Sequence, residues 1–91
     1  MNNTTKEIIL ITTEGCEGCA IMRNSIKQAI ALTKKEGITY KEYDFKAVND
    51  NTIKFTDFPT VVFKKDGRIV RKEVGTKPYI VVLRWIDISF K

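Results

Sequence analysis

The spacing of apolar residues changes several times along the chain, and each change marks the boundary of a predicted element. Residues 7–13 are almost continuously apolar and rich in isoleucine and threonine, which predicts a strand covered on both faces. Over residues 18–36 the apolar positions recur every three or four residues, the period of an amphipathic helix. This stripe consists of Cys19, Met22, Ile26, Ala29, Ile30 and Thr33. We expect Lys34 and Lys35 in the last helical turn and Gly37 just beyond it.

The next stretch of chain holds a second strand and then a segment with weak signals. Residues 38–45 are enriched in β-branched and aromatic side chains, which predicts a strand. Residues 46–56 carry few strong signals, and we interpret them as a short helix with loops. The polar residues 1–6 are expected to fray.

A proline and an Asp-Gly pair delimit the two strands that follow. Pro59 cannot donate a hydrogen bond to a sheet ladder, so we place it at the start of a strand over residues 60–64. Asp66-Gly67 is a strong signal for a tight hairpin, which joins that strand to residues 69–73.

The end of the chain returns to a helical period. Thr76 is a candidate N-cap and Pro78 is expected in the first turn. One apolar stripe follows, made of Tyr79, Val82, Leu83, Ile86 and Phe90. A strand over the same residues would mix charged and apolar side chains on one face, so the pattern favours a helix.

The resulting order is β-α-β-α-β-β-α, an α/β arrangement. The first β-α-β unit is long enough to connect two parallel strands, and the hairpin adds an antiparallel edge. We therefore expect a four-stranded mixed sheet with helices on both faces, in a single domain over residues 1–91.

Composition excludes several classes of function. The net charge is +5, but the basic residues are spread along the chain without interleaved aromatic residues, so no nucleic-acid partner is expected. No stretch approaches the roughly 20 apolar residues that cross a bilayer. The first residues show no apolar leader, and we expect a cytoplasmic protein. The chain lacks histidine, which removes the commonest general base and metal ligand.

The strongest candidate for chemistry is the motif Cys16-Glu17-Gly18-Cys19, which holds the only two cysteines. It stands between the first strand and the first helix, where thiol–disulfide chemistry is common in intracellular proteins. The dipole at a helix N-terminus favours the thiolate of the upstream cysteine. Two thiols at such a turn also suit Cu(I), and they could simply be unreactive thiols.

The element order, with Cys-x-x-Cys after the first strand and a proline before the third, resembles the thioredoxin/glutaredoxin superfamily. The resemblance extends from about residue 8 to residue 90. Its second half is the more specific part. Phe58-Pro59-Thr60-Val61-Val62-Phe63-Lys64-Lys65-Asp66-Gly67-Arg68, with Val74-Gly75 after it, is similar to the family's cis-proline, strand, hairpin and glycine.

The resemblance implies a role for each residue of the motif and of the proline segment. Cys16 matches the nucleophilic cysteine and Cys19 the resolving cysteine, with Glu17 and Gly18 between them. Pro59 matches a cis-proline beside the disulfide. The surface that docks substrates would then comprise Phe58, Pro59 and Thr60.

Two departures from the family pattern bear on mechanism. Leu10 stands six residues before Cys16, where thioredoxins carry a buried aspartate, so proton transfer at Cys19 needs water or another group. Val74-Gly75-Thr76-Lys77 replaces the Gly-Gly-Asp segment with which glutaredoxins grip glutathione. Arg23, one turn into the first helix, is interpreted as a solvated residue.

The predicted activity is reduction of protein disulfides by dithiol exchange through Cys16 and Cys19. We expect Cys16 to be partly exposed and Cys19 buried, with Glu14 and Glu17 opposing the activation of Cys16. The implied partners are disulfide-containing proteins and a reductant, either a flavoprotein like thioredoxin reductase or glutathione. We expect a monomer that holds no metal and no cofactor, because the redox-active group is the Cys16–Cys19 disulfide itself.

Two alternatives remain from other classes. One is a Cu(I) or soft-metal chaperone that uses both thiolates, although such domains run β-α-β-β-α-β and lack the proline and the C-terminal helix. Iron–sulfur ligation across a dimer, as in some glutaredoxins, is a related case. The other alternative is a redox-inactive binding module that has kept the fold.

Overall fold

The computed structural model describes residues 4–48 and 57–91. Its elements are β1 (Lys6–Thr12), α1 (Glu17–Leu32), β2 (Ile38–Asp44), the 3-10 helix η1 (Phe45–Ala47), β3 (Thr60–Lys65), β4 (Arg68–Val74) and α2 (Tyr79–Ser89). The strands and the two long helices follow the predicted order. A short helix is predicted within residues 46–56. The 3-10 helix η1 overlaps the start of that range, and residues 49–56 lie outside the described part.

The four strands form one mixed sheet in the order β2-β1-β3-β4. β1 pairs in parallel with β2 and antiparallel with β3, and β4 pairs antiparallel with β3. The β3–β4 turn places Asp66 at φ 54° and Gly67 at φ 80°. Two positive φ values fit the twist of a tight hairpin, which explains the Asp-Gly pair.

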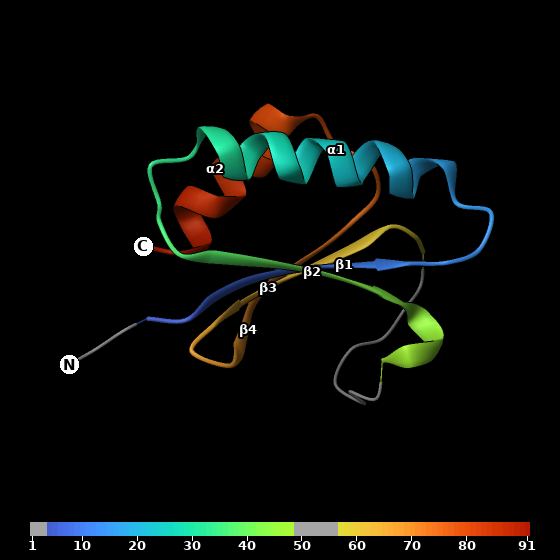
Figure 1. Cartoon of the computed structure of the whole chain (residues 1–91), viewed down its shortest axis with the longest axis horizontal. Coiled ribbons are helices and arrows are strands. Elements are labelled where there is room, and N and C mark those ends of the chain that lie inside the picture. The colour runs from blue at the N-terminus through green and yellow to red at the C-terminus, as the bar shows by residue number, and fades with distance from the viewer. Residues whose placement is uncertain (1–3, 49–56) are drawn as a thin grey trace.

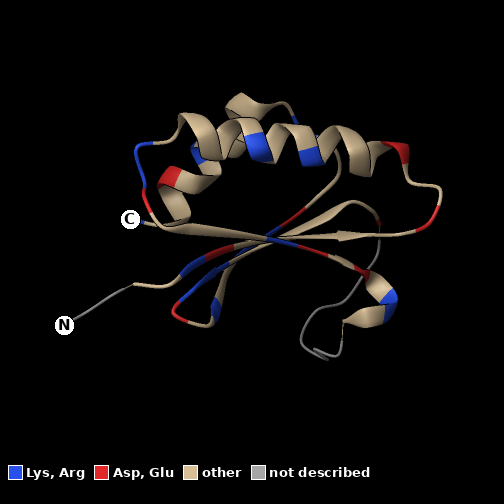
Figure 2. Ribbon diagram, viewed as in Figure 1, with Lys and Arg blue, Asp and Glu red and all other residues tan. Residues whose placement is uncertain are grey.

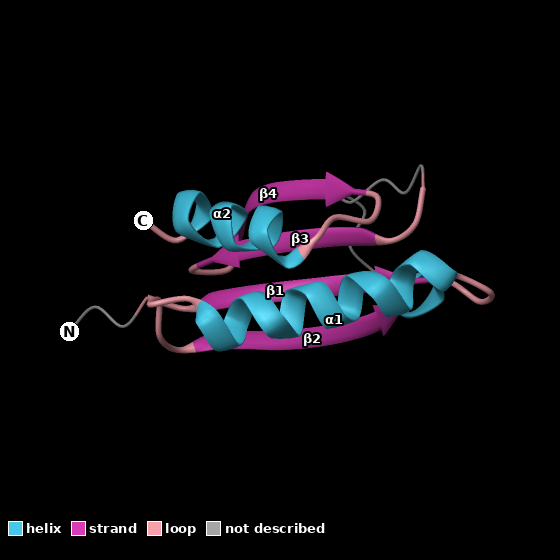
Figure 3. Ribbon diagram, turned by 90° about the horizontal axis from the view of Figure 1, so that it is seen from above, coloured by secondary structure: helices cyan, strands magenta, loops and turns pink. Residues whose placement is uncertain are grey.

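Both long helices lie on one face of the sheet, with α1 over β1 and β2 and α2 over β3 (Figures 1 and 3). Alternate strand residues point to this face, among them Ile8, Leu10, Val61 and Phe63. Phe63 meets Trp85 of α2 edge-on, with ring centroids 6.1 Å apart. This alternation places the main core between the sheet and the two helices.

The opposite face carries a smaller apolar cluster. Ile9, Ile11 and Val62 are buried there, and Phe45 of η1 packs against them together with Val48 and Phe58. β1 is thus covered on both faces, as its apolar run predicts. On this second face the described cover comes from η1 and the residues beside it.

α1 is shorter than predicted. It ends at Leu32 with Thr33 in an extended conformation, and the Thr33 hydroxyl accepts a hydrogen bond from Lys35 N–H at 3.1 Å. A threonine side chain that accepts a hydrogen bond from the main chain two residues further on competes with helix formation. The prediction that Lys34 and Lys35 occupy the last turn is therefore wrong.

α2 begins later than predicted. Pro78, in an extended conformation, is the N-cap residue, and its carbonyl oxygen accepts hydrogen bonds from Val81 and Val82. Proline is well suited to the start of a helix because it has no N–H to leave unpaired. Thr76 is not the cap, and its side chain bonds elsewhere.

The two ends of the described chain meet the β3–β4 hairpin. Thr5 N–H donates to Asp66 Oδ1 at 3.0 Å, and Lys65 Nζ donates to the main-chain oxygen of Lys91 at 2.5 Å. Both ends thus lie opposite the loop between β1 and α1 (Figure 1). Within residues 4–48 and 57–91, no helix has the length and apolarity needed to cross a membrane.

Candidate redox site

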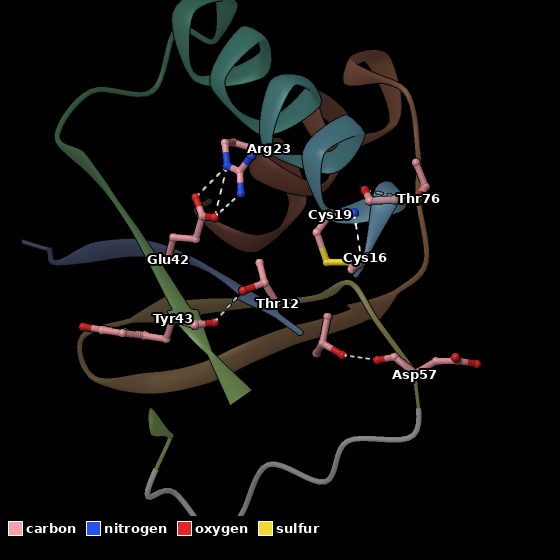
Figure 4. Close-up of a disulfide and its surroundings, with 10 residues drawn as sticks. Thr12, Cys16, Cys19, Arg23, Glu42, Tyr43, Asp57 and Thr76 are labelled. Atoms are coloured by element: carbon pink, nitrogen blue, oxygen red, sulfur yellow. Dashed lines mark hydrogen bonds and ion pairs between the residues drawn. A yellow bond between two sulfur atoms is a disulfide. The ribbon is translucent and has the colours of Figure 1, made fainter. Parts of the chain in front are cut away.

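Cys16 and Cys19 form a disulfide at the start of α1, with their Cα atoms 5.3 Å apart (Figure 4). Cys16 is the N-cap residue, and its sulfur accepts a hydrogen bond from Cys19 N–H at 3.0 Å. Cys16 is half-buried, whereas Cys19 is 3% exposed. The exposure of the two sulfur-bearing residues therefore differs in the predicted sense, and only Cys16 is open to a partner.

Gly18 is enclosed by two segments that are distant in sequence. A Cβ atom at this position would lie 2.6 Å from Thr76 Oγ1 and 3.4 Å from Pro59 Cδ. Thr76 Oγ1 also donates a hydrogen bond to the Gly18 carbonyl oxygen at 3.4 Å. The motif, the proline and the segment after β4 thus meet at one glycine, and the close approach explains the lack of a side chain there.

The proline segment lies beside the disulfide in the configuration that the family resemblance implies. The Phe58–Pro59 peptide bond is cis, and Pro59 is fully buried. Its carbonyl oxygen accepts a hydrogen bond from Gly75 N–H at 2.9 Å. Phe58 is half-buried and packs against Phe45, with ring centroids 5.3 Å apart.

Thr60 has a different position from the one expected of a substrate contact. It is fully buried, and its hydroxyl donates to the Asp57 carbonyl oxygen at 2.8 Å. This bond satisfies the buried hydroxyl and ties the start of β3 to the residue two positions before Pro59. Its side chain therefore supports the proline segment from inside.

Arg23 differs from the solvated residue predicted at this position. Its guanidinium forms a two-pronged ion pair with the carboxylate of Glu42 on β2 (Figure 4). Tyr40 donates to the same carboxylate at 3.0 Å. The bond to Arg23 lowers the pKa of Glu42, and burial raises the pKa of Tyr40, which keeps its proton. This network links α1 to the edge strand one turn after Cys19.

Exposed acidic residues stand on both sides of Cys16 in the sequence and just before the proline. Glu14, Glu17 and Asp57 are all exposed, and Figure 2 shows acidic residues in the loop before α1 and at its first turn. Lys77 follows Thr76 on the other side of Gly18 and is also exposed. The surface that a partner meets at Cys16 is therefore charged with both signs.

Sequence reasoning missed two residues of this region. Thr76 was expected to cap α2, and Glu42 had no predicted role. A threonine directly after a glycine that follows a strand was the available signal for Thr76, but only the fold brings it to Gly18. Among residues 4–48 and 57–91, no three cysteine or carboxylate side chains gather into a metal site.

Comparison with known proteins gives likeness in structure alone. No protein-family model and no curated protein sequence matches the chain. The structure is similar to that of a thioredoxin from Halobacterium salinarum, with TM-score 0.77 and 15% identity over 94% of this chain and 75% of that one. The chain has a thioredoxin-like fold.

Two further thioredoxins share this fold. Chloroplastic thioredoxin z aligns with TM-score 0.75 and 14% identity, over 94% of this chain and 79% of that one. Thioredoxin-2 of the malaria parasite, described as a component of its protein secretion machinery, aligns with TM-score 0.73 and 13% identity, over 97% of this chain and 86% of that one. In this thioredoxin-like fold the cysteine pair stands at the turn between β1 and α1.

Proposed function

We propose that the protein is a thiol–disulfide oxidoreductase that reduces disulfides in other proteins. The observation that carries the proposal is the Cys16–Cys19 disulfide at the N-terminus of α1, with Cys16 open to a partner and Cys19 buried. A pair of this kind separates the attacking sulfur from the resolving sulfur by exposure. Cys16 is the proposed nucleophile and Cys19 the proposed resolving residue.

The proposed reaction transfers two electrons in two exchange steps. The Cys16 thiolate attacks one sulfur of the substrate disulfide, and the other substrate sulfur leaves as a thiolate and takes a proton. Cys19 then loses its proton and attacks Cys16, which releases the second substrate thiol and leaves the Cys16–Cys19 disulfide. An external reductant returns two electrons to that disulfide, either a flavoprotein or glutathione.

Two features act in opposite directions on the Cys16 thiolate. The N-terminus of α1 and the Cys19 N–H, which bonds to the Cys16 sulfur at 3.0 Å, both favour negative charge there. Glu14 and Glu17 are exposed next to it and disfavour a further anion. The balance predicts a moderately activated thiol, suited to a reductase rather than to a strong oxidant.

The first test is the reduction potential of the pair, measured in glutathione and dithiothreitol buffers with mass detection of both forms. The expected result is a reversible two-electron transition near or below roughly −200 mV, the range of thioredoxins and glutaredoxins. A chain with no reversible disulfide that binds one Cu(I) tightly would instead support the copper-chaperone alternative.

Substitution of each cysteine tests the assigned roles. Cys19→Ser is expected to trap mixed disulfides with protein substrates through Cys16, because no second thiol resolves them. Cys16→Ser is expected to abolish exchange without trapping, since Cys19 is buried. Equal trapping by the two variants would contradict the roles.

A further inference from the structure

The first turn of α1 depends on a contact from outside the motif. Gly18 is the second residue of α1, and glycine within a helix costs about 1 kcal/mol relative to alanine. Its carbonyl oxygen accepts a hydrogen bond from Thr76 Oγ1 at 3.4 Å. Thr76 also occupies the space into which a side chain at residue 18 would extend, because Thr76 Oγ1 lies 2.6 Å from the position of a Cβ atom at residue 18.

Thr76 is itself held in place beside the proline. Gly75 N–H donates to the Pro59 carbonyl oxygen at 2.9 Å, which fixes the main chain one residue before Thr76. Gly75 has φ +101°, a conformation that favours glycine. Thr76 is exposed, so its hydroxyl has no need of this partner for burial.

We infer that Thr76 is a positioning residue that acts through Gly18 and sets the redox equilibrium of the Cys16–Cys19 pair. This role rests on the proposed function. In the oxidised protein the disulfide closes the turn from residue 16 to residue 19. In the reduced protein that covalent closure is gone, and the Thr76 contact is a larger part of what orders the turn. Removal of the contact therefore destabilises the reduced form more than the oxidised form.

The same ordering supports the reduced nucleophile. The Cys19 N–H that bonds to the Cys16 sulfur belongs to this turn. If the turn frays, the thiolate loses both this donor and part of the helix dipole. Loss of the Thr76 hydroxyl is thus expected to raise the pKa of the Cys16 thiol as well as to favour the disulfide.

The test compares Thr76→Ala with the wild-type chain in dithiothreitol redox buffers, where reduction of the pair oxidises one dithiothreitol. The variant is expected to shift the equilibrium about threefold toward the disulfide, ~14 mV at 29.6 mV per tenfold change. Thr76→Ser retains the hydroxyl and is expected to restore the wild-type value. Ultraviolet absorbance of the Cys16 thiolate, followed against pH, should show a higher thiol pKa in Thr76→Ala and the wild-type pKa in Thr76→Ser.

Thr12→Ala is the matched control. Thr12 Oγ1 also donates to a main-chain carbonyl at 3.4 Å, that of Tyr43, but it joins β1 to β2 and not to the motif. This variant is expected to leave the redox equilibrium unchanged. A Thr76→Ala shift no larger than that of Thr12→Ala would overturn the inference. A wild-type chain with no reversible transition would overturn the proposed function, and the redox role of Thr76 with it.

A second comparison tests the contact itself. Gly18→Ala is expected to displace Thr76 and to lower the midpoint of thermal unfolding, because the added methyl meets Oγ1 at 2.6 Å. In the Thr76→Ala background the same change should be harmless or stabilising. The remaining neighbours, Pro59 Cδ at 3.4 Å and the residue 76 Cβ at 3.9 Å, are at ordinary contact distance, and alanine favours the helix. An equal cost in both backgrounds would contradict the contact.

Discussion

Glu42 of β2 lies directly beside Leu10 of β1 in the parallel pairing of these two strands. Its carboxylate turns to the helix side, where Arg23 of α1 holds it. By the resemblance to thioredoxins, Leu10 takes the place of a buried aspartate, whereas the neighbouring strand of this chain carries the acidic Glu42. That group is bound in an ion pair, which suits it to join α1 to β2 rather than to accept protons.

Glu42→Gln is expected to lower stability at neutral pH and to have no effect in acid. Arg23 lowers the pKa of Glu42 below its ordinary 4.5, so the ionised form is favoured by folding. This contribution is complete above the unfolded pKa and is lost as the pH falls through the folded pKa. For a largely exposed pair we expect a fall of about 1–3 °C in the midpoint at pH 7.

Thermal unfolding of wild type and Glu42→Gln from pH 7 down to pH 2 measures this dependence. The two curves should converge at the acidic end. A constant difference across the whole range would show that the substitution acts through packing and not through the charge of Glu42.

Phe45→Ala is expected to slow exchange with protein disulfides severalfold and to cost about 1–2 kcal/mol of stability. Phe45 supports Phe58 by ring contact, and Phe58 precedes the proline beside the disulfide. Tyr43→Ala removes a nearby aromatic side chain that is 41% exposed, and it serves as the control. Insulin reduction measures the rate. Equal rates for the two variants would argue against this support.

The sequence predicts the fold well because its signals are local. Alternating and continuous apolar runs mark β1 and β3, the helical stripe marks α1, and Asp66-Gly67 marks the hairpin. Each of these depends on neighbours within a few residues, and the sheet order follows from connection rules. The errors lie at helix ends, where Thr33 and Pro78 end or begin a helix through hydrogen bonds that propensity does not reveal.

The site is predicted less completely than the fold. Cys16 and Cys19 are visible because two cysteines at this spacing are rare and chemically specific. Thr76 and Glu42 are common residue types without a motif, and each acquires its contact only when distant segments meet. The Gly18–Thr76 pair joins positions 58 residues apart, which no period along the chain can indicate.

Phe63→Ala is expected to cost about 3–5 kcal/mol of unfolding free energy. Phe63 is fully buried between Trp85 and Phe90, at ring distances of 6.1 and 5.9 Å. Val70→Ala on β4, where Val70 is 45% exposed, should change stability by less than about 0.5 kcal/mol. Trp85 fluorescence during urea unfolding reports both, since it is the only tryptophan. A small loss for Phe63→Ala would contradict this core.

Gly75→Ala and Gly67→Ala are both expected to lower stability, but only Gly75→Ala is expected to slow disulfide exchange. Gly75 has φ +101° and Gly67 has φ +80°, so a side chain at either should cost about 1–2 kcal/mol. Only Gly75 bonds to Pro59, and only its variant should also slow exchange with a protein disulfide. Urea unfolding and insulin reduction give the two measurements. Equal exchange rates for the two variants would contradict a role of the Gly75–Pro59 hydrogen bond in exchange.

Both ends of the described chain lie at the β3–β4 hairpin, across the molecule from the loop between β1 and α1 (Figure 1). An attachment that follows Lys91, whether a fused domain, a peptide tag or a solid support, therefore begins on the side of the molecule away from the β1–α1 loop. A protein tethered in this way presents the half-buried Cys16 outward, toward whatever approaches from solution. The same geometry makes the chain suitable as bait on a resin, because a captured partner does not compete with the anchor for space.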